Sequence, residues 1–352
     1  MRGALQDFYS GRRVFLTGHT GFKGSWLSLY LNSLGCKVVG YALPPPTDPS
    51  LFQVADISRK VTSFTGDILD FTNLLAAFSR HHPEIVFHMA AQSLVRCSYS
   101  IPLETLATNV MGTAHVLEAA RKTDSVRVVI IVTSDKCYEN ENWVWGYREN
   151  DPLGGHDPYS ASKACAELIT RAYTRSFFQD STKAVSSVRA GNVLGGGDWA
   201  QDRLVPDCVR FLTSRKPIVL RNPQAVRPWQ HVLDALTGYL LLAHKMYESP
   251  HQYSGAWNFG PGDDAILTVR EVAVSITEHW GEGSVEILPD PALHEMGTLK
   301  LDSSKARTLL GWRPRWSIQK TIAKTVEWYK AHAAGEAMEM VCRNQIREYL
   351  EV

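Results

Sequence analysis

The chain has 352 residues, 44% hydrophobic and 21% charged, a balance typical of a folded globular protein of roughly two domains. Its 37 Lys and Arg against 36 Asp and Glu leave a net charge of +1, so charge gives no reason to expect a nucleic-acid partner. The apolar run 128–132 is too short to span a membrane, and the first 13 residues lack the apolar region of a secretory signal. Six scattered cysteines without a C-x-x-C pair indicate reduced thiols, so we expect a soluble, cytoplasmic protein.

Strand-like and helix-like segments alternate through the first half of the chain. Short runs rich in β-branched and apolar residues begin near positions 13, 37, 60, 84, 126 and 184. Between most of them, apolar residues recur at helical intervals, as at Trp26, Tyr30 and Leu34 and again over 110–121. This alternation predicts a parallel sheet with helices on both faces, and therefore a doubly wound α/β fold.

The first predicted strand runs directly into a turn with glycines at positions 18, 21 and 24, and then into a predicted helix. Glycines at this spacing permit a tight turn, close approach of a pyrophosphate to backbone N–H groups, and close packing of helix on strand. The pattern predicts a dinucleotide site. The second predicted strand ends Gly-Tyr-Ala-Leu at 40–43, without the usual carboxylate for a ribose 2′-OH or an arginine for a 2′-phosphate. Of the two cofactors, we favour NAD over NADP.

Polar residues follow the ends of two later predicted strands. The Gly-Asp-Ile segment at 66–68 is expected either to contact the adenine or to form a simple strand-end turn. The Thr-Ser-Asp-Lys segment at 133–136 follows an apolar strand, at the edge where open α/β sheets bind ligands. A hydroxyl, a carboxylate and an amine at this edge suit the orientation of a substrate hydroxyl and the transfer of protons. The alternative interpretation is a capped turn.

Tyr159 and Lys163 lie four residues apart after Pro158, a residue common in the first turn of a helix. On such a helix they occupy one face. A phenol with a pKa of about 10 is a poor base at neutral pH, and an adjacent ammonium favours its phenolate. The spacing is common on exposed helices, but together with the glycine turn it predicts a catalytic pair.

The character of the sequence changes near residue 191, after which Gly and Pro become frequent. We expect residues 1–190 to form an NAD-binding domain that carries the catalytic residues. Residues 191–352 are expected to form a smaller domain that mainly binds substrate, with part of the chain returning to the sheet. Segments 234–247 and 269–280 have helical spacing.

Three further features of the second half have a structural interpretation. We expect His231 and His294 to pack or cap rather than to catalyse. The Trp and Tyr residues of 312–329 are expected in the core or in a subunit interface. No cluster of His, Cys or carboxylate residues has the spacing of metal ligands, so we expect no metal.

Together, these motifs resemble those of the extended short-chain dehydrogenase/reductase family, which has a Rossmann-type fold. Within it, the chain is most similar to the nucleotide-sugar 4,6-dehydratases, over nearly its whole length. The resemblance rests on GHTGFKGSW (18–26), PSLF (49–52), HMAAQ (88–92), TSDKCY (133–138), WVWGY (143–147), YSASK (159–163) and RAGNV (189–193). His19, Lys23 and Lys136 indicate the subgroup.

The resemblance implies bound NAD, a CDP-linked glucose as substrate, and a set of binding residues. The expected cofactor-binding residues are Gly18, His19, Thr20, Gly21, Phe22, Lys23, Asp67, Ile68, Ala90, Ala91, Gln92, Val132, Tyr159 and Lys163. The expected substrate-binding residues are Ser134, Asn192, Arg203, Leu204, Val219, Arg221 and Arg227. The guanidinium groups of Arg203 and Arg227 suit a pyrophosphate, and a solvated surface charge is the alternative for each.

The resemblance also implies a chemical role for each catalytic residue. Tyr159, assisted by Ser134 and Lys163, takes the proton of the sugar 4-hydroxyl while the C4 hydride passes to NAD. A base then removes the C5 proton, Asp135 protonates the departing 6-hydroxyl, and the hydride returns to C6. Related dTDP-glucose dehydratases have Glu where this chain has Lys136, and an ammonium cannot accept a proton. Lys136 is therefore either neutral, through desolvation and a nearby Lys163, or has another role.

Two other functions fit part of the pattern. A 4-epimerase or 4-reductase needs the Tyr/Lys pair but not the acid–base residues at 135–136, and a non-catalytic nucleotide sensor would be expected to lack Tyr159 or Lys163. A dehydratase fits all of it. By analogy with the family, the helix expected at 159–178 is a pairing surface. We therefore expect a homodimer or homotetramer that binds neither nucleic acid nor membrane.

Overall fold

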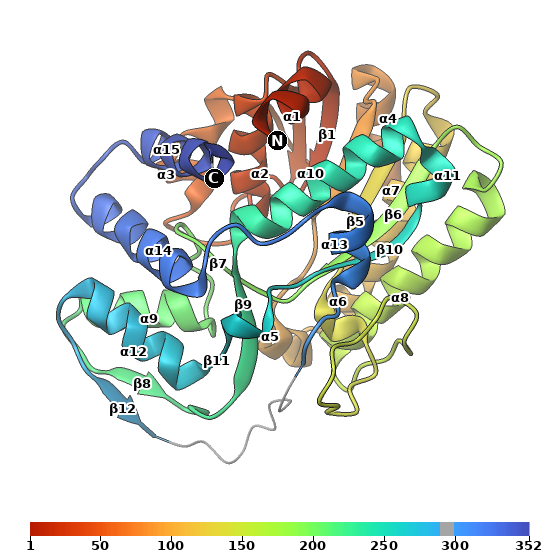
Figure 1. Ribbon diagram of the computed structural model, residues 1–352. Helices are drawn as coiled ribbons and strands as arrows, with labels where there is room; N and C mark the ends of the chain where they lie inside the picture. Colours follow the sequence, from red (N-terminus) through yellow and green to blue (C-terminus); the bar gives the residue numbers. More distant parts are fainter. Residues whose placement is uncertain (289–298, 352) are drawn as a thin grey trace.

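The structure is a computed structural model that describes residues 1–288 and 299–351. Within these residues the centre is a seven-stranded parallel sheet with strand order β10-β6-β5-β4-β1-β2-β3 (Figure 1). Its strands are Arg13–Thr17 (β1), Lys37–Ala42 (β2), Thr62–Thr65 (β3), Ile85–His88 (β4), Val128–Val132 (β5), Ala184–Ala190 (β6) and Gly255–Phe259 (β10). The strand order reverses between β1 and β4, as in doubly wound sheets, so the predicted fold class is confirmed.

Helices cover both faces of the sheet. One face packs against α1 (Arg2–Tyr9), α2 (Phe22–Ser33) and α10 (Val232–Glu248), and the other against α4 (Phe71–His81), α7 (Gly112–Lys122) and α8 (Pro158–Tyr173). Successive side chains of a strand point to opposite faces, so Val14 and Leu16 join one core and Phe15 the other. The apolar residues that recur at helical intervals in the sequence thus lie on the helix faces that pack against the sheet.

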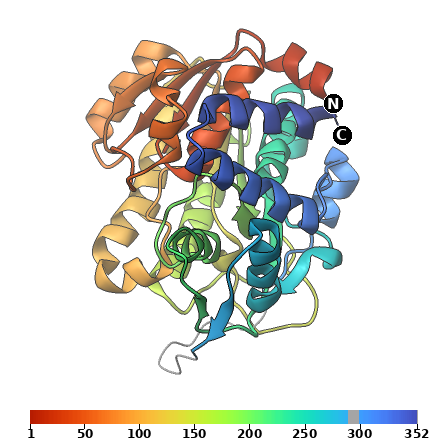
Figure 2. The same cartoon turned by 90° about the vertical axis from the view of Figure 1, so that its left-hand side faces the viewer.

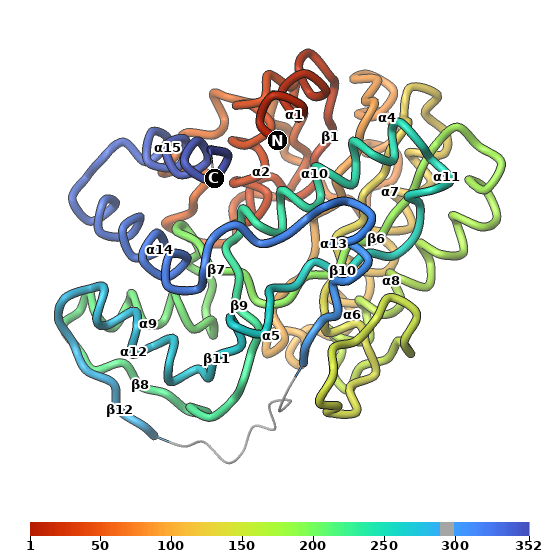
Figure 3. The backbone as a smooth tube through the Cα atoms, viewed as in Figure 1, coloured from red at the N-terminus to blue at the C-terminus, as the bar shows by residue number. Residues whose placement is uncertain are grey.

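The chain after residue 191 contributes to the main sheet and to two smaller ones. Strand β10 pairs in parallel with β6. The smaller sheets contain Asn192–Leu194 (β7), Val226–His231 (β9) and Ile266–Thr268 (β11), and Ile218–Leu220 (β8) and Val285–Ile287 (β12). Helices α9 (Leu204–Thr213) and α12 (Val269–Trp280) lie with β8 and β12 in a lobe away from the main sheet (Figure 3). Helices α10 and α12 confirm the predictions at 234–247 and 269–280.

Shorter elements and the C-terminal helices complete the fold. The remaining helices are Leu51–Val54 (α3), Val95–Ser100 (α5), Pro102–Leu106 (α6), Pro250–Tyr253 (α11), Ser304–Leu310 (α13), Ile318–Ala333 (α14) and Met338–Glu351 (α15). Single turns occur at Ile57–Arg59, Asp135–Cys137 and Asp263–Ala265, and wider π-helical turns at Ala107–Met111 and Thr174–Phe178. The two ends of the chain lie side by side (Figure 2), where Arg2 forms an ion pair with Glu351 at 3.6 Å.

The aromatic residues of 312–329 belong to the core. Trp312, Trp316, Trp328 and Tyr329 are each at most 4% exposed. Trp312 and Trp316 precede α14, so only the later pair follows helical geometry. His231 is fully buried, and its Nδ1 accepts a hydrogen bond from Leu233 N at the start of α10, which confirms the capping prediction. His294 lies outside the described residues.

Candidate active site

The glycine turn between β1 and α2 is built for close backbone contacts. Gly18 has a φ of +74°, and a Cβ there would come within 2.6 Å of Ala90 N. A Cβ at Gly24 would collide with the carbonyl of Gly18. At Gly21, by contrast, a Cβ would meet nothing nearer than ordinary contact at 3.5 Å, and α2 begins there without a side-chain cap. Uncapped N–H groups beside an open glycine fit the pyrophosphate of a dinucleotide.

His19 turns away from this open position into the sheet. Its ring is fully buried, its Nε2 lies 2.7 Å from Ser63 Oγ on β3, and it packs edge-on against Phe52. A side chain at Gly40 of β2 would collide with the imidazole. Burial lowers the pKa of His19 to about 4, so the ring is neutral at pH 7. Strand β2 therefore has no carboxylate at its end, and the His19 imidazole packs against the strand at Gly40.

The expected cofactor segment 90–92 is tied to both the glycine turn and α8. Thr17 Oγ1 accepts hydrogen bonds from Met89 N (3.1 Å) and Ala90 N (3.2 Å). Asn109 accepts from Gln92 N at 2.9 Å and donates to Ser162 Oγ at 2.8 Å. The end of β4 is therefore held between β1 and the helix that carries Tyr159. Sequence analysis did not identify Asn109, because only the fold brings it to this edge.

Ser134, Asp135, Tyr159 and Lys163 meet at the carboxyl end of β5, as the sequence predicts. Ser134 Oγ donates to Asp135 Oδ1 at 3.0 Å, and Lys163 Nζ donates to the carbonyl of Val132 at 3.2 Å. All four side chains are buried, with exposed fractions of 5–7%. Helix α8 begins at Pro158 after an Asp157 cap, and this start places Tyr159 and Lys163 on one helix face.

The acidity of Tyr159 is set by several groups. Burial raises its pKa to about 12, while a hydrogen bond with Ser134 and the charge of Arg203 lower it. From the sequence, Arg203 was expected either to bind the substrate pyrophosphate or to be a solvated surface charge. In the fold, its guanidinium also reaches Asp198 Oδ2 at 2.8 Å and Ser93 Oγ at 3.1 Å. The guanidinium of Arg203 therefore interacts with Asp198, Ser93 and the phenol of Tyr159.

Lys23 and Lys163 form a pair of like charges. Burial and then the charge of Lys23 lower the pKa of Lys163 to about 8. Burial and the charge of Arg203 also lower the pKa of Lys23 to about 8, opposed by Asp135 and Asp198. The sequence led us to place Lys136 beside Lys163, but the ammonium that acts on Lys163 belongs to Lys23. Lys136 is partly exposed, and its backbone N–H donates to Ser134 Oγ at 3.2 Å.

The other expected substrate residues are spread along the segments after β6. Asn192 begins β7, Leu204 begins α9, Val219 lies in β8 and Arg227 in β9. Arg221 donates to Asp202 Oδ1 at 3.3 Å, and Arg96 reaches the same oxygen at 3.0 Å. Expected adenine-side residues Asp67 and Ile68 follow β3, where Asp67 Oδ1 accepts from Leu69 N.

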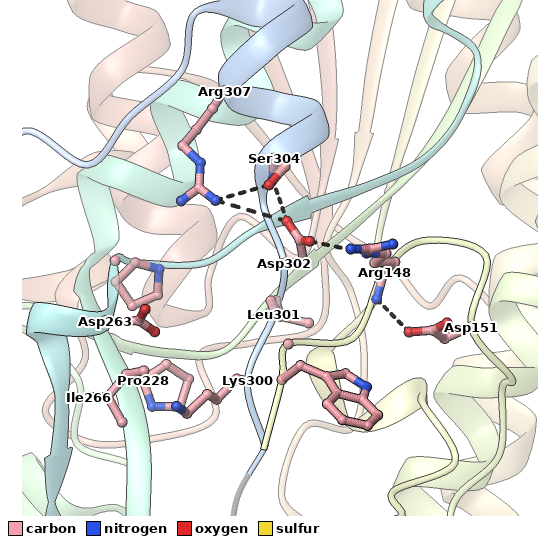
Figure 4. Close-up of a pocket in the computed structure, with 14 residues that line it drawn as sticks. Arg148, Asp151, Pro228, Asp263, Ile266, Lys300, Leu301, Asp302, Ser304 and Arg307 are labelled. Carbon is pink, nitrogen blue, oxygen red and sulfur yellow. Dashed lines mark hydrogen bonds and ion pairs between the residues drawn. The ribbon is translucent and has the colours of Figure 1, made fainter. Parts of the chain in front are cut away.

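A cavity of about 480 Å³ has Pro228 in its lining (Figure 4). Pro228 Cγ and Asp135 Oδ2 both lie just over 3 Å from where a Cβ of Gly191 would be. At the rim, Asp302 lies between two guanidinium groups, with Arg148 Nε at 3.2 Å and Arg307 Nη2 at 3.9 Å. The lining as a whole has three basic side chains and three acidic ones, so its formal charges balance: Arg148, Lys300 and Arg307 against Asp151, Asp263 and Asp302.

Residues 1–288 and 299–351 contain neither a cluster of metal ligands nor a membrane-spanning helix. No three His, Cys, Asp or Glu side chains in these ranges come together as metal ligands. No helix within them has the length and apolar character required to cross a bilayer.

Comparison with known proteins places this site in a family. Residues 15–325 match the family described as GDP-mannose 4,6 dehydratase. The chain belongs to that family. This 4,6-dehydratase family member is 48% identical over 351 residues to CDP-glucose 4,6-dehydratase of Salmonella typhimurium, with 98% of each chain covered. It is also 27% identical to UDP-glucose 4-epimerase of Mycolicibacterium smegmatis, over 90% of this chain and 98% of that protein.

A solved structure supports the same membership. The dTDP-glucose 4,6-dehydratase DesIV of Streptomyces venezuelae, solved with NAD and TYD bound, superposes with a TM-score of 0.78 at 26% identity. The match covers 93% of this family member and 99% of the solved chain. The resemblance noted in the sequence is thereby confirmed.

Proposed function

We propose that this protein converts CDP-glucose to CDP-4-dehydro-6-deoxyglucose with NAD as a regenerated cofactor, and so acts as a lyase in the supply of deoxysugars. The observation that carries the proposal is the 48% identity, across 98% of both chains, to a CDP-glucose 4,6-dehydratase. The open glycine turn and uncapped α2 terminus fit the dinucleotide. Loss of water and intramolecular hydride return leave no net redox change, so no external oxidant is needed.

The first step removes a proton and a hydride from C4. NAD, when bound, supplies the acceptor for the C4 hydride and the store from which it returns to C6. Tyr159 takes the 4-hydroxyl proton, and Ser134 and Arg203 make its phenol more acidic. Lys163 adds positive charge one helical turn away, its Nζ held by the carbonyl of Val132. Oxidation at C4 then makes the C5 hydrogen acidic.

The second step eliminates water. Asp135, buried beside Ser134, is the acid that protonates the departing 6-hydroxyl. We propose that position 136 takes part in removal of the C5 proton, since the backbone of Lys136 lies in the same turn as Asp135. Lys136→Glu, which introduces the base of dTDP-glucose dehydratases, tests the assignment: it should retain more activity than Lys136→Met.

The experiment that tests the function follows the hydride. Purified protein is incubated with NAD and CDP-glucose deuterated at C4, with dTDP-, GDP- and UDP-glucose in parallel, and product mass is read. We expect loss of water from the CDP-sugar with deuterium retained at C6. A product that has not lost the mass of water would indicate a 4-epimerase or 4-reductase instead. The chain is 27% identical to a UDP-glucose 4-epimerase, so this alternative is part of the test.

We also propose a homodimer or dimer of dimers that pairs through α8 and its neighbours. Large apolar side chains there are exposed by 37–77%: Tyr99, Leu103, Leu106, Met111, Leu168 and Phe177. They belong to α5, α6, α8 and the two π-helical turns, and these elements pack on one another. Exposed apolar residues grouped in this way are typical of an interface, and a second copy of the chain carries the same group.

We also propose separate roles for the two parts of the chain, and a cellular compartment for the protein. Residues 1–190 would bind NAD and carry the catalytic side chains, and residues 191–352 would mainly bind the nucleotide sugar through Asn192, Arg203, Arg221 and Arg227. We place the protein in the cytoplasm, because all six cysteines are unpaired thiols, as a reducing compartment requires.

A further inference from the structure

A buried ion pair contacts both ends of segment 133–138, the catalytic turn that carries Ser134 and Asp135. Glu167 on α8 accepts from Arg189 Nη2 of β6 at 2.7 Å, and both side chains are 3% exposed. The same carboxylate accepts from Thr133 Oγ1 at 2.5 Å and from Ser187 Oγ at 2.6 Å. Thr133 and Ser187 are themselves buried, with exposed fractions of 6% and 3%.

The pair holds the turn at both of its ends. Thr133 comes immediately before Ser134 and donates to Glu167. Tyr138 comes immediately after the Asp135–Cys137 turn, and its hydroxyl accepts from Arg189 Nη1 at 2.6 Å and donates to Asn258 Oδ1 at 2.8 Å. The backbone between these two anchors carries both Ser134 and Asp135.

We propose that Glu167 and Arg189 are positioning residues for the elimination step: through Thr133 and Tyr138 they hold the turn so that Asp135 stays aligned to protonate the leaving hydroxyl. The inference rests on the proposed function. A buried ion pair is a poor device for stability alone, since desolvation of the charges offsets much of their attraction. Alignment of an acid to a fraction of an ångström, by contrast, strongly affects rate.

Glu167 also acts on the charge of Lys163. It follows Lys163 by four residues on α8, and its carboxylate raises the pKa of that lysine against the effects of burial and Lys23. The pair therefore affects both steps of the reaction. It acts on elimination through hydrogen bonds to the turn that carries Asp135, and on oxidation at C4 through its charge near Lys163.

The test separates the anchors from the rest of the network. Thr133→Val and Tyr138→Phe each remove one anchor without changing the ion pair. Ser187→Ala is the matched control, because it removes a hydrogen bond to the same carboxylate from a residue outside the turn. We expect kcat with CDP-glucose to fall about tenfold or more in the two anchor variants and less than about twofold in the control. KM should change little in all three.

Single-turnover absorbance of the reduced nicotinamide gives a second readout. In Thr133→Val and Tyr138→Phe, the cofactor should be reduced at nearly the normal rate but reoxidised slowly, because elimination precedes hydride return. Thr133→Ser keeps the hydroxyl and should restore reoxidation. In Glu167→Gln, the alkaline limb of the kcat profile should move to lower pH, because Lys163 loses the carboxylate that favours its charged form. Loss of packing alone would not move that limb.

The outcomes distinguish this inference from the function on which it rests. A wild-type protein that does not dehydrate CDP-glucose overturns the proposed function and the inference with it. An active wild type whose anchor variants match Ser187→Ala, or slow reduction and reoxidation equally, overturns the inference alone. Thermal melting of each variant shows whether it is folded, and the conservative anchor variants decide the question if Glu167→Gln does not fold.

Discussion

Ser134 Oγ donates a hydrogen bond to Asp135 Oδ1 at 3.0 Å, so the hydroxyl that acts on Tyr159 and the proposed acid are partners in one buried turn. The pairing links the two chemical steps. A change at Asp135 alters what Ser134 donates to, and a change at Ser134 removes a hydrogen bond from both Asp135 and Tyr159. Variants must therefore be assigned to a step by following the cofactor as well as the product.

Asp135→Asn should slow elimination and leave oxidation at C4 largely intact. The amide can still accept the hydrogen bond from Ser134, but it has no acidic proton to give. General acids typically contribute about 10²–10⁴-fold, so turnover should fall by that order while reduced nicotinamide accumulates in a single turnover. Asp151→Asn, at a carboxylate that accepts a hydrogen bond from Arg148 N, is the control. Wild-type turnover in Asp135→Asn would remove its assigned role.

Tyr159→Phe and Lys163→Ala should block the reaction before any reduced cofactor forms. The first variant has no phenolate oxygen to accept the 4-hydroxyl proton, and the second loses the cation beside it. Stopped-flow absorbance should show no nicotinamide reduction with CDP-glucose in either variant. Tyr173→Phe, further along the same helix, should behave as wild type. Rapid reduction in Tyr159→Phe would show that another group takes the proton.

The alkaline limb of the kcat profile should report Lys163. Its pKa is lowered to about 8, so the ammonium is fully present below that pH and is lost as pH rises through it. Activity should therefore decline above about pH 8. Lys23→Met removes the neighbouring positive charge, which raises the pKa of Lys163 and should move the limb to higher pH. An unchanged limb in Lys23→Met would show that the two ammonium groups do not interact.

Purified protein should be partly free of NAD and gain activity when NAD is added. Strand β2 ends without a carboxylate for the ribose, and loss of one such hydrogen bond weakens binding by about 0.5–1.5 kcal/mol or more. Full occupancy on purification, with no response to added NAD, would contradict this.

His19→Gly should lower the free energy of unfolding by about 2 kcal/mol or more, because it removes a buried ring packed against Phe52 and Ser63. Denaturant titration measures the loss, and calorimetry of the apo-protein shows whether NAD affinity also changes.

Leu103→Glu should shift the protein from the dimer or tetramer toward the monomer. Leu103 is 77% exposed within the proposed pairing surface, and a carboxylate buried there without a partner opposes association. Met340→Glu, at a residue 54% exposed on α15, is the control and should leave the mass unchanged. Light scattering measures both. A monomeric wild type, or an unchanged mass in Leu103→Glu, would place the interface elsewhere or remove it.

Local sequence patterns determined much of this protein. The strand–turn–helix at 13–33, the alternation of strands and helices, and the four-residue spacing of Tyr159 and Lys163 are short-range features, and the structure has each of them. They can be predicted because strand alternation, helical period and glycine geometry depend on neighbours a few residues apart. The meeting of the catalytic turn with α8 follows from the sheet topology that this alternation implies.

Only the tertiary structure decided which charges face one another. Lys23, rather than Lys136, acts on Lys163, and Arg203 acts on Tyr159. Arg189 begins the segment 189–193 that carries part of the family resemblance, but Glu167 lies in no motif, and nothing in the sequence pairs the two residues. The physical reason is that electrostatic and hydrogen-bond partners depend on distances of a few ångströms between segments far apart in the chain. Those distances are set by how helices and strands pack, and no local spacing encodes them.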